Sequence, residues 1–461
     1  MSGDVPNVRF YARRHRTTDA KRTRLDSNFV GGGVCKEGTD SKILQLDDRD
    51  WISNLHQDVV QCILEHLSVH DAAKTSVLSK EWRHKWGMKN NLVLDEAFFL
   101  KVTSNKDKDP CQTGFLRAIE MIILVHKAPV LSFNLYIPPK LDHCLVSRWM
   151  EHFLNKRIKV LEMTNSEKNV YEIPLFICEG LVELKLSTWI LNPLPKPGSF
   201  TNLLKVELNN VSITGEVSFG SQLKILYLNV CTGVEHLSCQ FSNANKLTDL
   251  LLRESEQIEW RWFECTKQLE AFGLALTKAN PNTTKPVNLI KLLSSTPTIT
   301  LLFLSGYTVE VLGPLYSMSK ELAPKIENLK LIDLGYHNLC QLFNSLYLIR
   351  CLPNLQILQI ILEPGAKSLN RTVEQFLEFL DWNGLLLNQL HTVAIEGVVG
   401  ETTVLHFIKF LLATSPSLRV MTLGCNIKVN AHDEIQKIAK ELVQYPKKSS
   451  VAKIYLSFRP L

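Results

Sequence analysis

The sequence lacks the features that mark several large classes of protein. No apolar run approaches the roughly 18 residues that span a bilayer, and the first residues have no apolar core typical of a secretory signal. The 11 cysteines form no C-x-x-C pair, and most stand beside apolar residues. We therefore expect reduced, buried thiols in a protein of the nucleus or cytoplasm that has no contact with membranes.

Motifs of catalysis are also missing. The sequence contains no phosphate-cradling G-x-x-x-x-G-K-[ST] loop, no G-x-G-x-x-G, no H-E-x-x-H and no G-x-S-x-G. A reactive cysteine would need an activating environment that the sequence does not display. These absences predict a protein that is not an enzyme and that holds no cofactor or metal.

Charge is scarce outside one segment. Of the net charge of +6, residues 9–24 supply seven basic side chains and one acid, which leaves the rest of the chain close to neutral. We expect residues 1–46 to form a disordered basic tail, either merely solvated or carrying a nuclear-import patch around Lys21 and Arg22. A near-neutral body argues against nucleic-acid binding along its length.

The sequence does contain a leucine pattern that recurs at positions i, i+3 and i+5. Copies begin at Val130, Ile158, Leu181, Leu203, Leu223, Leu247, Leu269, Ile299, Ile326, Leu355, Leu390, Leu418 and Val451. This L-x-x-L-x-L core is the strand signature of leucine-rich repeats. One unit cannot bury its own apolar face, so we predict an α/β fold: a leucine-rich-repeat solenoid, or horseshoe, of stacked parallel strands. Closer spacing from Ile158 to Leu269 predicts tight returns there, and wider spacing after Leu269 leaves room for helices, such as one around 405–412.

A different pattern precedes the repeats. Apolar residues at helical spacing predict one helix over 59–67, a second capped by Asp71, and a third capped by Ser79 that carries Trp82 and Trp86. A further helix is expected over 115–125. Three short helices bury little apolar surface, so this small unit should need a partner or the solenoid for support.

Residues 50–86, DWISNLHQDVVQCILEHLSVHDAAKTSVLSKEWRHKW, resemble a plant-type F-box. Agreement falls at Asp50, Ile52, Ser53, Leu55, Val59, Ile63, Leu64, Leu67, Asp71, Ala72, Thr75, Ser76, Leu78, Ser79, Trp82, Arg83 and Trp86. Residues 390–423 resemble the FBD segment found in many plant F-box proteins. The resemblance to the F-box/FBD/leucine-rich-repeat family implies an F-box at 47–90, a solenoid at 91–384 and FBD-like repeats at 385–461 that continue the solenoid.

The family resemblance implies a substrate-recognition subunit of a cullin-based, SCF-type ubiquitin ligase, whose F-box docks a Skp-type adaptor and whose repeats bind an unknown target protein. We expect the adaptor contacts at Leu55, Val59, Ile63, Leu64, Leu67, Asp71, Leu78, Trp82 and Trp86. Two family prolines are replaced by His56 and Ser68, which should loosen two loops and puts adaptor affinity in more doubt than the fold. The alternatives are a plain repeat scaffold with a decayed F-box, or a small-molecule receptor.

The residues between the repeat leucines should line the concave face of the solenoid. Along that face we expect charged residues first and then an apolar patch that contacts the target, formed by Tyr227, Leu251, Leu301 and Phe303. The alternatives are that the loop 278–286 covers this patch, or that the register is shifted by one residue and these side chains belong to the core.

Overall fold

The computed structural model describes residues 52–103, 112–154, 156–167, 180–192, 200–237, 245–255, 266–277, 293, 296–311, 325–363, 386–427 and 432–460. The chain divides into two units, Met1–Trp51 and Ile52–Leu461, and every described residue belongs to the second. The expected basic tail at 1–46 and the expected loop at 278–286 lie outside the described residues.

The F-box region begins with two α-helices, α1 (Gln57–His66) and α2 (Val69–Lys74). The N-cap of α2 is Ser68, so Asp71 lies in the first turn of the helix and is not its cap as expected. The third predicted helix is also different. Two short 3-10 helices, η1 (Thr75–Val77) and η2 (Lys85–Met88), take its place, with turns at 80–84 between them. A single short turn is marginal as an α-helix, so burial of the tryptophans decides the backbone here.

All thirteen expected repeat strands are present in one parallel sheet. The described part of this sheet has 14 strands, because β1 (Asn91–Leu94), which the leucine pattern did not predict, pairs with β2. The strands are β2 (Ser132–Ile137), β3 (Val160–Asn165), β4 (Glu183–Ser187), β6 (Lys205–Asn209), β8 (Ile225–Asn229), β9 (Asp249–Arg253), β10 (Ala271–Ala275), β11 (Leu301–Ser305), β12 (Asn328–Leu334), β13 (Ile357–Leu362), β14 (Thr392–Val398), β15 (Val420–Ile427) and β16 (Lys453–Pro460). Two short strands, β5 (Ile190–Leu191) and β7 (Ser212–Ile213), form a separate pair.

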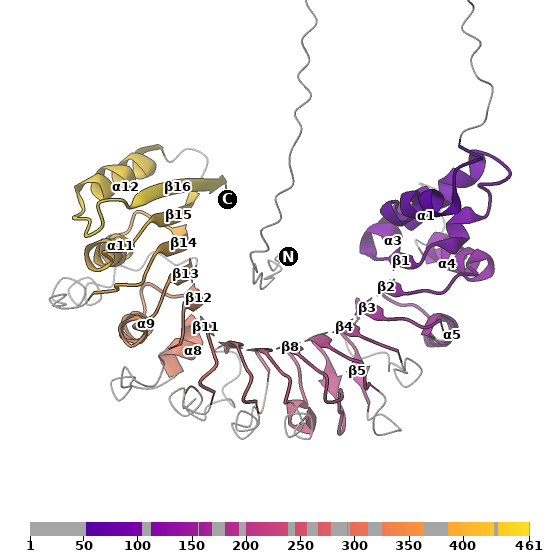
Figure 1. The fold of residues 1–461 in the computed structure, drawn as a ribbon, viewed down its shortest axis with the longest axis horizontal. Coiled ribbons are helices and arrows are strands. Elements are labelled where there is room, and N and C mark those ends of the chain that lie inside the picture. The colour runs from indigo at the N-terminus through magenta and orange to yellow at the C-terminus, as the bar shows by residue number, and fades with distance from the viewer. Residues whose placement is uncertain are drawn as a thin grey trace, which may run out of the picture. The chain divides into compact units, whose positions relative to one another are not determined.

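Within this unit the strands form the inner side of a curved solenoid, and the helices that follow residue 111 lie on its outer side (Figure 1). The helices are α3 (Glu96–Thr103), α4 (Gln112–Val125), α5 (His143–Leu154), α8 (Gly306–Val311), α9 (Leu339–Arg350), α11 (Thr402–Thr414) and α12 (His432–Gln444), with a 3-10 turn, η4, at Val234–Leu237. The wider-spaced later repeats therefore hold helices, as expected. No described helix is both long enough and apolar enough to cross a membrane.

The repeat leucines face the core, as the strand pattern predicts. In β4, β6 and β8, for example, the residues alternate between buried and partly exposed positions, and the buried ones include Leu184, Val206 and Leu226. This alternation follows from the two-residue period of a strand. The side chains between the leucines are left on the opposite, inner face of the sheet.

A left-handed residue ends four successive strands and joins each repeat to the next. Thr188, Asn210, Val230 and Glu254 all have φ between 47° and 66°, and their backbone N–H groups donate to carbonyls of the following repeat at 2.7–2.8 Å. The next residue after Val230 is Cys231, whose buried thiol lies 3.4 Å from the backbone oxygens of Leu208 and Asn229. Burial raises the pKa of the Cys231 thiol to about 11, so this cysteine is a structural residue.

Candidate functional site

Three of the residues expected to contact an adaptor are exposed. Val59 and Ile63 lie one turn apart on the same face of α1, with 45% and 39% of their surface accessible. Leu78 follows η1 and is 53% exposed. Large apolar side chains held in water on such a small unit mark a surface that favours a protein partner.

Three other residues of that expected set are in the core. Leu64, Trp82 and Trp86 are 0%, 2% and 8% exposed, and the indole Nε1 of Trp82 donates to the backbone oxygen of Ile52 at 2.9 Å. They therefore hold the F-box together and do not present a surface to a partner. Sequence reasoning placed them at an interface because it assumed that so small a unit could not bury them, whereas α3, α4 and the first repeats extend the same core.

The remaining residues of the set are intermediate. Leu55 and Leu67 are partly buried against the core. The carboxylate of Asp71 accepts from Ser68 Oγ at 2.7 Å and from Lys101 Nζ at 3.0 Å. These two contacts, the Ser68 hydroxyl first, hold the pKa of Asp71 far below its usual range, so at neutral pH this residue is an acidic group at the start of α2.

The two positions without the family prolines keep a proline-like backbone. His56 has φ −57° and ψ 143°, and Ser68 has φ −61° and ψ 156°, within the range that a proline ring imposes. Both side chains cap the helix that follows: His56 accepts from the N–H of Asp58 and Ser68 from the N–H of Asp71. Helix-capping hydrogen bonds from His56 and Ser68 therefore hold these two loops in place of proline rings.

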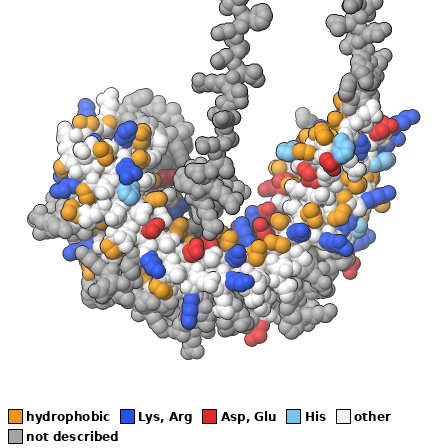
Figure 2. Space-filling view, in the orientation of Figure 1, with side chains coloured by type: hydrophobic (Ala, Val, Ile, Leu, Met, Phe, Trp, Pro, Cys, Tyr) orange, Lys and Arg blue, Asp and Glu red, His pale blue; other side chains and the backbone are white. Residues whose placement is uncertain are grey.

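Sequence reasoning missed further exposed apolar residues in this region. Ile52, Val77 and Met88 are 51%, 86% and 44% exposed. Their positions are apolar in the sequence, but only the fold shows that they do not face the core. Figure 2 shows hydrophobic side chains at the surface over the F-box end of the unit, among charged residues.

The inner face of the sheet carries one continuous column of side chains. The strand pairing brings together Asn134, Glu162, Lys185, Glu207, Tyr227, Leu251, Gly273, Phe303, Lys330, Gln359, Ala394, Thr422 and Tyr455. The expected register for the inner face is confirmed by this column, which changes from charged to apolar and then to polar residues.

The first part of the column is charged and internally paired. Glu162 forms an ion pair with Lys185 on the neighbouring strand, and Lys205 lies 2.7 Å from Glu207 on the same strand. All four side chains are partly exposed. Ion pairs in contact with water contribute little to stability, so this part of the inner face is a charged surface accessible to water.

The second part of the column contains the apolar patch. Tyr227, Leu251 and Leu301 are partly exposed, and burial, Asp249 and Glu207 raise the pKa of the Tyr227 hydroxyl well above its usual value. Phe303, in contrast, is 2% exposed, which corrects its expected place in an open patch. Phe303 is buried because it packs over Gly273 on the neighbouring strand, where there is no side chain. The space is already filled: a Cβ added to Gly273 would be 2.4 Å from Leu251 Cδ1 and 3.2 Å from Phe303 Cδ1.

Leu251 and Phe303 therefore cover Gly273, and the inner face has no open space at this position of β10. Lys330, next in the column, places Nζ 5.9 Å from the centre of the Phe303 ring, within reach of a cation–π contact. Burial lowers the pKa of Lys330, while the charge of Glu396 acts in the opposite direction. The proposed cover, loop 278–286, lies outside the described residues.

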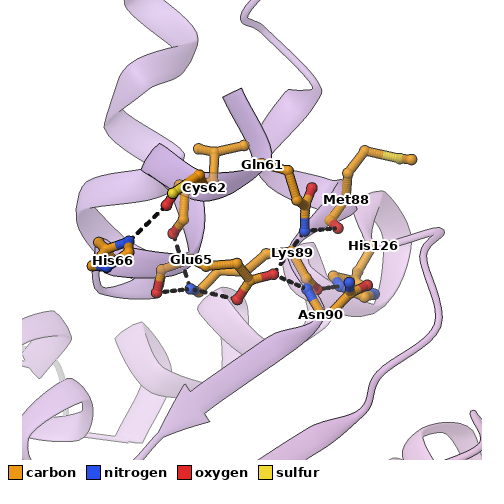
Figure 3. Close-up of polar contacts among 9 residues, drawn as sticks. Gln61, Cys62, Glu65, His66, Met88, Lys89, Asn90 and His126 are labelled. Carbon is orange, nitrogen blue, oxygen red and sulfur yellow. Dashed lines mark hydrogen bonds and ion pairs between the residues drawn. The ribbon is translucent and has the colours of Figure 1, made fainter. Parts of the chain in front are cut away.

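The segment between η2 and β1 is bonded to the end of α1 (Figure 3). Lys89 is buried there, and its ammonium group donates to the backbone oxygens of Leu64 at 2.9 Å and Glu65 at 3.1 Å. Oε2 of Glu65 lies 3.4 Å from the same nitrogen. The three protons of the ammonium group thus have three acceptors.

The same segment is bonded on its other side to the first repeats. Nε2 of His126 lies 2.7 Å from the backbone oxygen of Lys89, and because a carbonyl only accepts, this nitrogen carries the proton. Burial lowers the pKa of His126. Sequence reasoning missed Glu65, Lys89 and His126, since they are far apart in the chain and no motif links them.

Potential metal ligands do not cluster in the described part of the chain. No group of three or more His, Cys, Asp or Glu side chains there is arranged to hold a metal ion. The free cysteines at Cys231, Cys351 and Cys425 are buried as expected, whereas those at Cys62, Cys144 and Cys340 are exposed, which corrects the expectation of buried thiols at these three positions. What the described residues offer is two surfaces, an apolar one on the F-box and a mixed one along the inner face of the sheet.

Known proteins with similar sequences share both parts of this architecture. The F-box domain model matches residues 52–94. An F-box/FBD/LRR-repeat protein of Arabidopsis thaliana is 27% identical over 422 residues, which are 88% of this chain and 98% of that protein. A second one is 26% identical over 460 residues, covering 88% and 96%. An FBD-associated F-box protein of the same plant is 25% identical over 466 residues, again covering 88% and 96%.

Among solved structures, an internalin from Listeria monocytogenes is similar at 12% identity and a TM-score of 0.32, covering 78% of this chain and 92% of the internalin. The F-box match, the relatives that extend over nearly the whole chain and the ladder of parallel strands lead to one conclusion. This chain has an F-box domain followed by a ladder of parallel strands of the leucine-rich-repeat type, and it is similar over most of its length to the F-box/FBD/LRR-repeat proteins of Arabidopsis thaliana.

Proposed function

We propose that this protein is the substrate-recognition subunit of an SCF-type ubiquitin ligase and has no catalytic activity of its own. The observation that carries the proposal is the apolar surface of Val59, Ile63 and Leu78 inside the residues that match the F-box model. In this role the F-box binds a Skp-type adaptor, the adaptor binds a cullin, and the repeats hold the target. We place the protein in the nucleus or cytoplasm, where its exposed thiols stay reduced.

The mechanism is one of tethering. A target bound to the repeats and a catalytic subunit bound through the adaptor meet at a high effective concentration, so ubiquitin transfer becomes an event within one complex. The F-box surface is suited to its part because apolar side chains near the centre of an interface supply most of its binding energy. A standard interface buries roughly 1,600 Å² in total, which requires neighbouring exposed residues such as Val77 as well.

Binding to a purified Skp-type adaptor tests the first half of this role. The double variant V59D/I63D should lower adaptor affinity about tenfold or more, equivalent to about 1.4 kcal/mol, because two charges would be buried in an apolar contact. The control is V443D, which makes the same change at an exposed valine on α12. It should bind as the wild type does.

If the unmodified protein does not bind the adaptor at micromolar concentration, the ligase role is wrong and the scaffold with a decayed F-box takes its place. Circular dichroism and thermal unfolding of both variants show whether each remains folded. Equal loss of binding in V59D/I63D and V443D would mean that the effect does not come from the F-box surface.

The second half of the role concerns the target. We propose that the partly exposed Tyr227, Leu251 and Leu301, with the charged residues beside them, contact it. The variant L251D/L301D should lose a target that the wild type captures in cells, while its affinity for the adaptor stays unchanged. A target captured equally by both would remove this part of the inner face from the proposal.

A further inference from the structure

Lys89 stands apart from the other charged residues. Among the residues that the structure describes, it is the only lysine, arginine, aspartate or glutamate that is buried, with 2% of its surface accessible. A buried ammonium group is costly unless it is fully paired, and here every proton has an acceptor on α1. Lys89 therefore supplies the hydrogen bonds and the positive charge that the C-terminal end of this helix favours.

Glu65 completes the attachment of α1 to the following segment. Its Oε1 accepts from the backbone N–H of Asn90 at 2.6 Å and from Nε2 of Gln61 at 2.7 Å. The same Gln61 nitrogen donates to the backbone oxygen of Met88 at 3.2 Å. Three consecutive residues, Met88 to Asn90, are thus bonded to side chains or backbone of α1, as Figure 3 shows.

The opposite side of this segment is bonded to the residues that follow α4 and to the start of β2. The backbone oxygen of Gly87 accepts from Lys127 and Ala128, and that of Asn90 accepts from Leu131 and Ser132. A Cβ on Gly87 would lie 2.8 Å from the backbone oxygen of Val125, so the contact with the end of α4 is close. Residues 87–90 are therefore joined to α1 and to the repeats at the same time and do not act as a free linker.

We propose that Lys89 is a positioning residue that locks the F-box to the first repeats, so that the adaptor and the target are held at a preset separation. The inference rests on the proposed ligase function. With a flexible linker, the two bound proteins would sample a broad range of distances. A fixed junction restricts them to one geometry, and so restricts which lysines of a target meet the catalytic subunit.

The variant K89M separates this role from folding of the F-box. Methionine fills a similar volume without charge, and Glu65, which is 26% exposed, can turn to water when its partner is lost. The core contacts of Leu64, Trp82 and Trp86 remain. The F-box should therefore stay folded and bind the adaptor with less than threefold change. Its attachment to the repeats loses the hydrogen bonds and ion pair of Lys89 and keeps only the shared apolar core, so it should loosen.

The distance between the F-box and the solenoid is the direct measurement. Spin labels on noncanonical amino acids at Lys80 and Lys224, both exposed, avoid the native cysteines. In the full-length wild type we expect one narrow distance distribution, and in K89M a distribution at least twice as broad. The control K74M makes the same change at an exposed lysine of α2 and should match the wild type.

Ubiquitination gives a second measurement. In a reconstituted ligase, lysines on the repeats of this chain serve as acceptors, and mass spectrometry shows which are modified. A locked junction should confine modification to a small set of lysines, and K89M should spread it over more of them. A purely structural residue would instead lower total modification together with adaptor binding.

The milder variant E65Q keeps the acceptor for Asn90 and removes the ion pair, and it should broaden the distances less than K89M does. An unchanged distance distribution in K89M overturns the proposal. Loss of adaptor binding in both K89M and E65Q also overturns it, because Lys89 then belongs to the fold of the F-box. If the wild type fails to bind the adaptor but K89M still broadens the distances, the locked junction stands and the ligase role fails.

Discussion

Ser68 and Asp71 form two hydrogen bonds with each other at the start of α2. The backbone N–H of Asp71 donates to Ser68 Oγ at 3.1 Å, and the Ser68 hydroxyl donates to Oδ2 of Asp71 at 2.7 Å. Ser68 stands where related F-boxes have proline, yet its φ of −61° is close to the proline value. One side chain thus replaces the rigidity of a ring with two hydrogen bonds.

This geometry predicts different results for two substitutions of Ser68. The variant S68A removes the cap and should lower the free energy of opening of α2 by about 1 kcal/mol. The variant S68P also removes the cap, but proline restricts the unfolded chain, which restores about 0.4–1 kcal/mol. The preceding residue, Leu67, is extended and accommodates a following proline. Protection of the α2 amides from hydrogen exchange should therefore be highest in the wild type, lower in S68P and lowest in S68A.

Burial of Trp82 predicts that its removal acts through folding. The variant W82A should cost the F-box about 3–5 kcal/mol and abolish adaptor binding because the apolar surface is no longer held in place. The variant W82F loses the hydrogen bond to Ile52, worth about 1 kcal/mol, and should keep most of the binding. Hydrogen exchange and adaptor affinity measured on both variants check this. A loss of affinity in W82F with unchanged exchange would show that the indole itself contacts the adaptor.

A strained backbone position predicts a stabilising change. Val230 has φ 53° and its N–H donates to Arg253 across the repeats, and a left-handed conformation costs a branched residue about 1–2 kcal/mol. The variant V230N should therefore raise the free energy of unfolding by about 1 kcal/mol, seen as a higher urea midpoint. The equivalent position one repeat earlier is Asn210 with φ 52°. The reverse change there, N210V, should lower the midpoint by a similar amount.

His126 predicts a pH dependence at the junction. Its pKa is lowered mainly by burial, with the charges of Lys156 and His152 acting in the same direction and the Lys89 carbonyl and Glu65 opposing them. The unfolded chain therefore binds more protons between this lowered pKa and about 6.5. Stability should rise with pH through that window and fall as the solution is acidified.

Hydrogen exchange of α1 and α4 amides between pH 5 and 7 measures this effect. The variant H126Q retains an N–H donor for the carbonyl of Lys89 and does not titrate, so it should reduce the slope. It should not remove the slope, because burial also lowers the pKa of His152. An identical slope in the wild type and H126Q would assign the dependence to other groups.

Much of the fold follows from local sequence patterns. The thirteen strand positions were predictable because each leucine triplet has the spacing that a strand buries on one face, and neighbouring copies repeat it. The helices α1, α4 and α11 were predictable from their apolar periodicity. Strand β1, which was not predicted, has only four residues. The third helix was predicted but is replaced by two 3-10 helices, because the backbone there depends on burial of Trp82 and Trp86 more than on local propensity.

The functional surfaces were predictable only in part. Val59, Ile63 and Leu78 were named as contact residues and are exposed, but Leu64 and Trp86 were named for the same reason and are buried. An apolar residue reads the same in the sequence whether it faces the core or a partner. The choice is made by the elements that pack beside it, and these come from α3, α4 and the first repeats.

By itself, the sequence determined that the chain is a stack of parallel strands preceded by a small helical unit, because strand spacing and helical spacing are local properties. The resemblance of residues 50–86 to a plant-type F-box indicated which kind of helical unit this is. Only the tertiary structure decided that Phe303 closes over Gly273 and that Lys89 reaches Glu65. Both relationships join residues 24 or more positions apart, and their distances depend on how whole elements pack. The passage from a family resemblance to particular binding and positioning residues therefore required the three-dimensional arrangement.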